Sequence, residues 1–145
     1  RKAQRRSFKL IREKALNEIV TKLGLRQNKA STIVYDYDDT WKHILNVVPR
    51  DFKMIPGAFV NWDNTPRYKK RASVEDGYSA EKFKRYLAIQ IKHAKEVYEK
   101  DMLFLFAWNE WGEGGYLEPD EEEKYARLEA VKEALIITRE WEDGV

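Results

Sequence analysis

The sequence predicts an α/β fold in which mostly parallel strands alternate with helices. Helical and strand-like segments follow one another along the 145-residue chain without an internal repeat. Such alternation is typical of a parallel sheet with right-handed crossovers. Residues 102–107 are apolar without alternation, as in a strand that is buried on both faces. At this length we expect a single α/β domain over residues 1–145.

The N-terminal segment is expected to be a basic amphipathic helix within residues 1–30. Apolar side chains recur three and four positions apart over residues 3–23, and Gly24 follows as a stop. Residues 1–29 carry ten Lys and Arg against two Glu, a net charge of +8, whereas residues 110–145 carry four against twelve, a net charge of -8. A basic run can indicate nucleic acid or an anionic membrane. Its apolar spacing favours a solvated helix face instead, so no nucleic-acid partner is expected.

The middle of the chain predicts two strands with a helix between them. Residues 31–36 favour a strand, and a helix is expected over residues 41–47, because Pro49 must end it. Residues 54–62 favour a second strand, although Pro56 and the glycine after it should delay its start.

The last part of the chain predicts two helices around the apolar strand. Residues 63–79 read as a polar loop, and Ser79 is a good N-cap for a helix that runs to about Lys100. Asp120 is expected to open the final helix, with Glu123 completing a capping box. The core stripe expected for that helix comprises Tyr125, Leu128, Ala130 or Val131, Leu135 and Thr138.

Composition excludes several classes of chemistry. The absence of cysteine excludes disulfides and thiolate catalysis and suits a cytoplasmic protein, the localisation that we expect. Two histidines make a histidine-rich zinc site improbable, so neither a metal nor a cofactor is expected. The longest apolar stretch, residues 102–108, is far shorter than the ~20 residues of a membrane span.

The strongest chemical signal is a pair of acids directly after the apolar strand. Glu110 and Glu113 are set among Trp108, Asn109 and Trp111. Two carboxyl groups beside flat aromatic rings suit sugar chemistry. One carboxyl group can protonate a leaving oxygen, while the other stabilises or assists the build-up of charge at the anomeric carbon. The two tryptophans flank the first acid, so one should point into a cleft and the other into the core.

A second strand also ends in a tryptophan, an acid and an asparagine, at Trp62, Asp63 and Asn64. If the two strands are neighbours, both clusters meet at one rim, because active sites lie at the carboxyl ends of parallel strands. The end of the first strand, near Tyr35, could add to this rim.

Each of these residues also has a structural interpretation. The two glutamates could contact helix N-termini or neighbouring arginines. Trp62 and Asp63 suit sugar binding and strand-end packing about equally, since Asp-Asn pairs also build turns. Arg67 could clamp a carboxylate or phosphate, or pair with Asp63 or Asp76.

Three strings, at residues 62–67, 107–114 and 117–120, resemble the C-terminal half of WbsX-type glycosyltransferases. That family belongs to polysaccharide biosynthesis and is similar to glycoside hydrolase family 99, the endo-α-mannosidase group with a (β/α)8 barrel. The resemblance covers residues 31–137 and leaves 138–145 as a tail. It implies the C-terminal portion of a TIM-type barrel. A full barrel takes about 250 residues, so the chain, which lacks an initiator methionine, is expected to be a fragment.

The resemblance also implies roles for the acids. Glu113 resembles the general acid/base of the hydrolases, and Glu110 resembles the base that activates the sugar 2-hydroxyl. Gly112 stands where family 99 enzymes carry histidine, which weakens any claim of mannosidase specificity.

Two classes of function follow from these observations. The first is glycosyl transfer or retaining hydrolysis on a bacterial surface polysaccharide, with a saccharide substrate or a nucleotide sugar. The alternative is a non-catalytic carbohydrate-binding or interaction domain. In either case we expect the chain to pack against the missing N-terminal part of the barrel or against a second copy of itself.

Overall fold

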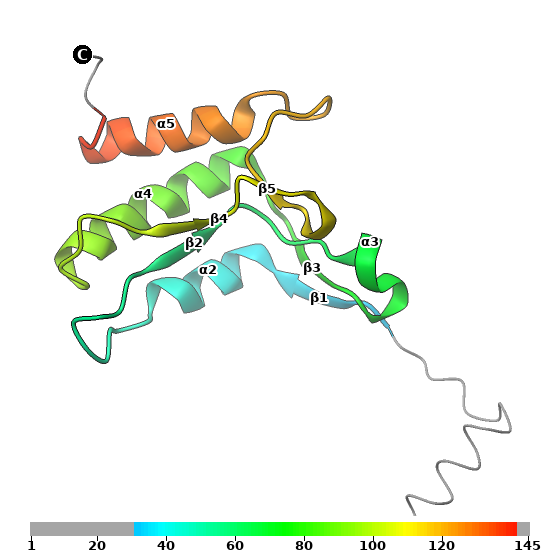
Figure 1. Cartoon of the computed structure of the whole chain (residues 1–145), viewed down its shortest axis with the longest axis horizontal. Helices are drawn as coiled ribbons and strands as arrows, with labels where there is room; N and C mark the ends of the chain where they lie inside the picture. Colours follow the sequence, from blue (N-terminus) through cyan, green and yellow to red (C-terminus); the bar gives the residue numbers. More distant parts are fainter. Residues whose placement is uncertain (1–30, 142–145) are drawn as a thin grey trace, which may run out of the picture. The chain divides into compact units, whose positions relative to one another are not determined.

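The computed structural model describes residues 31–141, so the expected N-terminal helix and the last four residues lie outside the described part. Short strands alternate with helices along it (Figure 1). The elements are β1 (Ile33–Asp36), α2 (Tyr37–Leu45), β2 (Gly57–Phe59), α3 (Thr65–Tyr68), the 3-10 turn η1 (Lys69–Arg71), β3 (Ser73–Asp76), α4 (Ala80–Glu96), β4 (Phe104–Phe106), β5 (Asn109–Glu110), the 3-10 turn η2 (Trp111–Glu113), β6 (Gly115–Tyr116) and α5 (Ala126–Thr138).

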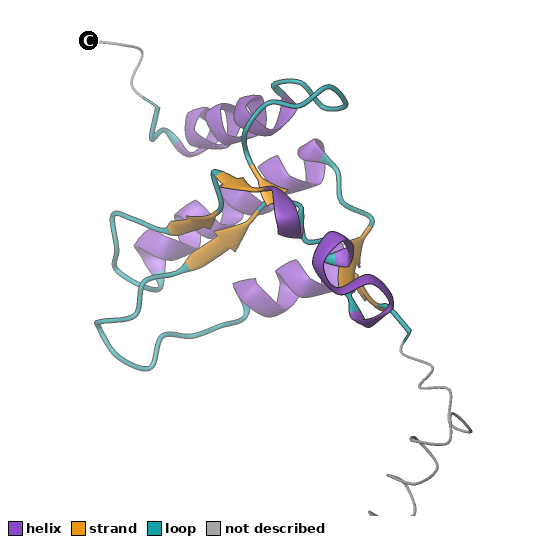
Figure 2. Ribbon diagram, turned by 45° about the vertical axis from the view of Figure 1, so that its right-hand side comes forward, coloured by secondary structure: helices purple, strands orange, loops and turns teal. Residues whose placement is uncertain are grey.

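The strands of the described part form short pairs, two of them parallel. β2 runs parallel to β4, β1 runs parallel to β3, and β5 and β6 form an antiparallel hairpin (Figure 2). The chain beyond β2 continues antiparallel to β3, where the Glu75 N–H donates to the Trp62 carbonyl at 2.8 Å. The α/β class and the parallel pairing are confirmed. The second strand begins at Gly57 rather than at residue 54, so its start is delayed past Pro56 but not past Gly57, and it ends at Phe59 rather than at residue 62.

The first described helix begins four residues earlier than the sequence predicts. Asp36 caps α2, because its Oδ1 accepts the Asp39 N–H at 2.9 Å. The helix therefore starts at Tyr37 rather than Trp41. The sequence did not reveal Asp36 as an N-cap, because this aspartate is also the last residue of the strand that the apolar residues before it favour.

The expectation of a polar loop over residues 63–79 is wrong. This segment contains α3, η1 and β3. β3 has the sequence Ser-Val-Glu-Asp, with one apolar residue, and it is a strand because it pairs with β1, in register from Ile33 opposite Ser73. A partner so distant in the sequence leaves no local periodicity to detect.

Two helix ends also differ from the prediction. α5 begins at Ala126 rather than Asp120, because Lys124 has a φ of 54° and interrupts any helix through it. α4 begins after its expected cap, since the Ser79 Oγ accepts the Lys82 N–H at 3.2 Å, but it ends at Glu96, before Lys100.

An aromatic cluster forms the centre of the core. Trp41 is fully buried and stacks on Tyr86 with ring centroids 5.4 Å apart, and on Phe59 at 5.3 Å. The Tyr37 hydroxyl donates to the Val60 carbonyl at 2.7 Å. The cluster thus packs α2 and α4 against β2 and fixes the chain just where β2 ends.

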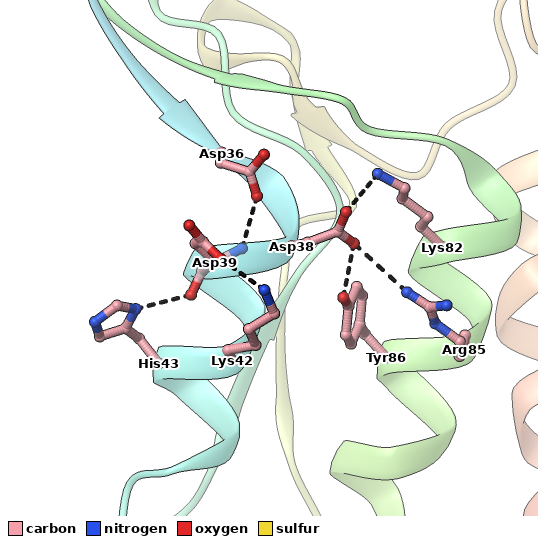
Figure 3. A network of polar contacts seen from close by, with 8 residues as sticks. All are labelled: Asp36, Asp38, Asp39, Lys42, His43, Lys82, Arg85 and Tyr86. Atoms are coloured by element: carbon pink, nitrogen blue, oxygen red, sulfur yellow. Dashed lines mark hydrogen bonds and ion pairs between the residues drawn. The ribbon is translucent and has the colours of Figure 1, made fainter.

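A polar network joins the first turn of α2 to α4 (Figure 3). The Asp38 carboxylate accepts hydrogen bonds from Lys82 Nζ at 2.7 Å and from the Tyr86 hydroxyl at 2.6 Å, and Arg85 lies 3.5 Å away. The Lys82 hydrogen bond is the main reason that the pKa of Asp38 is lowered. The N-terminal end of α2 is therefore held against α4.

Helices α4 and α5 lie side by side (Figures 1 and 2). α5 buries two small residues, Ala130 and Ala134, and the expected stripe members Leu128, Val131 and Leu135 are half-buried beside them. Small side chains shorten the distance between two packed helices. Placing Tyr125 in the stripe is wrong, because its side chain is 62% exposed.

Candidate functional site

The carboxyl ends of β2 and β4 meet, as the sequence predicts. β2 and β4 are hydrogen-bonded in parallel from Gly57 opposite Phe104. The backbone stays paired beyond the strands, because the Asp63 N–H donates to the Glu113 carbonyl at 2.8 Å. The two motifs with aromatic and acidic residues therefore share one rim.

The glycines of the second motif let the backbone turn tightly beside the acids. Gly114 has a φ of 64°, in the left-handed region that glycine adopts without strain. A Cβ at Gly115 would lie 2.5 Å from the Phe106 ring. The turn between β5 and β6 consequently lies directly against the strand end.

A single arginine joins the two candidate acids. Arg67 Nη1 donates to Glu113 Oε1 at 3.0 Å, and Nη2 of the same guanidinium donates to Glu110 Oε1 in a very short contact. The side chains of Arg67, Glu110 and Glu113 are 49%, 31% and 17% exposed, so the group is open to solvent. Both carboxylates thus converge on one point, and of the structural interpretations above, contact with a neighbouring arginine is the one observed. Pairing of Arg67 with Asp63 or Asp76 is not.

Gly112 makes room for that arginine. A Cβ at position 112 would lie 2.6 Å from Arg67 Nε and 2.9 Å from Nη2. Any side chain there would compete with the guanidinium for the same space. The glycine at this position and the arginine bridge are therefore two parts of one arrangement.

The polar groups of the first motif support the rim. Trp62 Nε1 donates to Ser73 Oγ at 3.0 Å, and the buried Asn64 accepts the Ser73 N–H at 2.7 Å. Asp63 Oδ1 accepts the Thr65 N–H at 2.8 Å, which is an aspartate turn. Sequence reasoning missed Ser73, because it lay in the expected loop.

Trp111 is held in place by its neighbours. Its ring stacks on Tyr116 with centroids 3.8 Å apart, and its Nε1 donates to Glu118 Oε2 at 2.6 Å. The Arg127 guanidinium lies 4.2 Å from the Tyr116 ring. Sequence reasoning missed Tyr116 and Arg127, because their role rests on a three-dimensional stack with Trp111 and Asp120 that no local pattern encodes.

Asp120 holds Tyr116 and Arg127 of this stack in place through hydrogen bonds. Its carboxylate accepts hydrogen bonds from the Tyr116 hydroxyl at 2.6 Å, the Glu123 N–H at 2.6 Å and Arg127 Nη1 at 2.7 Å. The Tyr116 hydrogen bond is the largest of the causes that hold the pKa of Asp120 well below its usual range. The buried Arg127 is thereby neutralised.

Three candidate residues remain outside this network. Trp108 is 55% exposed and Asn109 is also exposed, so the expectation that one of the two tryptophans is buried is wrong. Tyr35 is 49% exposed and lies opposite Glu75 of β3, whose backbone bonds to Trp62. β3 therefore separates Tyr35 from the rim.

Within residues 31–141, no cluster of three or more histidine, aspartate or glutamate side chains is placed to hold a metal ion. None of the described helices is both long and apolar enough to cross a membrane.

Comparison with known proteins identifies the family. The model of the family described as Glycosyltransferase WbsX matches residues 2–131. Two curated relatives, both named "Uncharacterized protein WxcX", come from Xanthomonas campestris pv. campestris. The protein of strain B100 is 34% identical over 104 residues, which are 70% of this chain and 15% of that protein. The protein of strain ATCC 33913 is 38% identical over 88 residues, which are 59% of this chain and 13% of that protein.

The chain thus spans a small part of the curated relatives that it matches. No solved structure matches it. The family match nevertheless includes both motifs of the rim, with the arginine and the two glutamates that the structure brings together. The chain belongs to the WbsX glycosyltransferase family.

Proposed function

We propose that the intact protein acts on glycosidic bonds in polysaccharide biosynthesis, with Glu110 and Glu113 as its reactive carboxylates. The observation that carries this proposal is their convergence on Arg67 at the shared end of two parallel strands. Polar groups at such strand ends are the usual place for catalysis in α/β folds. The two exposed tryptophans beside Glu110 supply flat faces for a sugar ring.

The family match favours glycosyl transfer over hydrolysis, and the arrangement suits a transfer reaction. Both glutamates act as hydrogen-bond acceptors towards Arg67, and an ionised carboxylate serves as a base. In a transfer reaction the acceptor hydroxyl must lose a proton as it bonds to the anomeric carbon. Glu113, the less exposed of the two, would take that proton, and Glu110 would contact the sugar hydroxyls beside it.

The first experiment replaces each acid in the full-length protein. Glu110→Gln and Glu113→Gln should each reduce turnover by at least ~100-fold, because positioned acid–base groups contribute factors of about 10²–10⁴. Glu96→Gln, at an exposed position on α4, is the matched control and should leave turnover unchanged. Near-normal turnover in either site variant removes that residue from the mechanism.

The product distinguishes the two reactions. Release of a nucleoside diphosphate from a sugar donor supports transfer, whereas cleavage of an oligosaccharide without any nucleotide supports retaining hydrolysis. A carbohydrate-binding domain is the second candidate, because Trp111 is exposed yet fixed by Glu118 and Tyr116. On this alternative, the full-length protein binds a sugar but shows no turnover. Its sugar affinity is then unchanged by Glu110→Gln and by Glu113→Gln.

The described strands are proposed to belong to a (β/α)8 barrel in the intact protein. Ile33, Val34 and Phe104 are 54%, 60% and 68% exposed, although each lies in a strand. Strands with apolar side chains in solvent normally pack against further protein. We propose that other parts of the intact barrel cover them, with a second copy of the chain as the alternative.

A further inference from the structure

A run of cations continues along the chain from Arg67, which bridges the two glutamates. Residues 67–71 read Arg-Tyr-Lys-Lys-Arg and form the end of α3 and the turn η1. All five residues are exposed. Arg67 is occupied by the two glutamates, whereas Lys69, Lys70 and Arg71 make no ion pair with any residue between 31 and 141. Within residues 31–141, three cations without an ion pair therefore follow directly after the arginine that bridges the two carboxylates.

The turn is fixed at both ends. Before it, the carbonyl of the buried Asn64 accepts the N–H groups of Arg67 at 3.1 Å and Tyr68 at 3.0 Å. After it, the buried Ala72 donates its N–H to the Lys69 carbonyl at 3.1 Å and accepts from the Ile33 N–H at 2.9 Å. The cations are thus presented from a built turn whose backbone hydrogen bonds limit its movement.

Lys69 adopts a conformation that a lysine does not prefer. Its φ is 51° and its ψ is -122°, a region that glycine occupies at lower cost. Residues kept in such conformations cluster at functional sites, where a side chain is needed despite the strain. Glycine would satisfy this backbone geometry, so the turn itself does not require a lysine side chain.

We propose that Lys69, Lys70 and Arg71 bind the diphosphate group of an activated sugar donor. This inference rests on the proposed function, because the diphosphate would be the leaving group of the glycosyl transfer. The two glutamates and Arg67 together carry one net negative charge, which repels an anionic donor. The three cations of η1, which follow α3, would offset this repulsion and attract a diphosphate to the turn beside α3.

The bond changes balance without a further reactant. The bond between the anomeric carbon and the diphosphate oxygen breaks, and its electron pair leaves with the diphosphate. The acceptor hydroxyl oxygen bonds to the anomeric carbon, and its proton passes to a glutamate carboxylate. Lysine and arginine stabilise the charge that develops on the departing oxygen by charge-assisted hydrogen bonds.

The test measures the binding of inorganic pyrophosphate to the full-length protein by calorimetry. Lys70→Glu should weaken binding by at least about tenfold, because a charge-assisted contact is replaced by repulsion. Lys92→Glu makes the same change in net charge at an exposed position on α4 and should leave affinity unchanged. Equal affinities in the two variants, or no binding of pyrophosphate to the unmodified protein, overturn the proposal.

Lys69→Gly separates the ligand role from a structural one. The substitution relieves the backbone conformation, so the melting temperature should be maintained or rise, while pyrophosphate affinity should fall. Unchanged affinity with a higher melting temperature removes Lys69 from the site.

Two further measurements complete the test. Nucleoside diphosphates and vesicles that carry an isoprenoid diphosphate identify the source of the group, and Tyr68→Ala should weaken only the nucleoside form if the exposed ring stacks on a base. Glu110→Gln is assayed for turnover separately. Near-normal turnover in this variant removes Glu110 from the proposed mechanism, whereas pyrophosphate affinity reports on the cations alone.

Discussion

At the scale of single residues, Gly112 and Arg67 depend on each other. The space that a Cβ at position 112 would take is occupied by the guanidinium. Because the arginine side chain is flexible at its far end, it can move aside, but it then loses contact with Glu110 and Glu113. Gly112 therefore allows the Arg67 guanidinium to lie next to both acids.

We accordingly expect Gly112→Ala to leave the fold intact and to reduce turnover of the full-length protein. The reason is displacement of Arg67 from two charge-assisted hydrogen bonds, each worth about 1.5–3 kcal/mol. Turnover and melting temperature are measured together. Gly57→Ala is the matched control, because its added Cβ would lie 3.9 Å from the nearest heavy atom. Equal turnover in the two variants would show that the arginine bridge is not needed for activity.

Asp120 predicts a dependence of stability on pH. Its pKa is lowered in the folded protein from an ordinary value of 3.8, chiefly by the Tyr116 hydroxyl. A group with a lowered folded-state pKa stabilises the fold above its unfolded pKa, and this contribution is lost as the pH falls through the folded value. Asp38 acts in the same direction, with Lys82 as the main cause.

Asp120→Asn should therefore lower the melting temperature at pH 7 and have a smaller effect near pH 2. Thermal unfolding followed by circular dichroism across this interval checks the expectation. Asp101→Asn, at an exposed position whose side chain forms no hydrogen bond or ion pair with residues 31–141, is the control. A constant difference between Asp120→Asn and the unmodified protein at every pH would contradict the assignment.

At the scale of elements, the long amphipathic helix was the easiest to predict. α4 has apolar residues at helical spacing and a serine at its N-cap, so the sequence predicts both its buried face and its first residue. β3 has four residues and is a strand only through its partner β1. The rim was predictable because both strands end in the same residue types, whereas the Arg67 bridge depends on a close approach across 46 residues, which no local pattern encodes.

The contact between α4 and α5 yields a prediction about packing. Ala134 is fully buried in it, so Ala134→Leu should destabilise the protein by about 1–3 kcal/mol through overpacking. Denaturant unfolding measures the change. Glu129→Leu places the same side chain on an exposed position of α5 and is expected to change stability by less than about 0.5 kcal/mol. Similar losses for both variants would mean that the alanine contact is not tightly packed.

At the scale of the whole molecule, the exposed strand residues predict association of the isolated 145-residue chain. Strands with apolar side chains and free edges pair with other protein when nothing covers them. We expect concentration-dependent oligomers in analytical ultracentrifugation, and fewer of them after Val34→Lys or Phe104→Lys. Ile136→Lys, on the exposed surface of α5, should have little effect. A monomer at all concentrations would show that these strands need no cover.

The strand end that carries Trp62 and Asp63 is hydrogen-bonded on both sides, to Glu75 of β3 and to Glu113 of η2. The conformational entropy of this backbone is consequently lost when the protein folds. Under the proposed function, substrate binding then has little main-chain ordering left to oppose it, and the remaining adjustment falls on rotatable side chains, above all on Arg67. The rim is a preorganised backbone frame around one rotatable side chain, and the position of the Arg67 guanidinium would then decide which sugars the proposed site accepts.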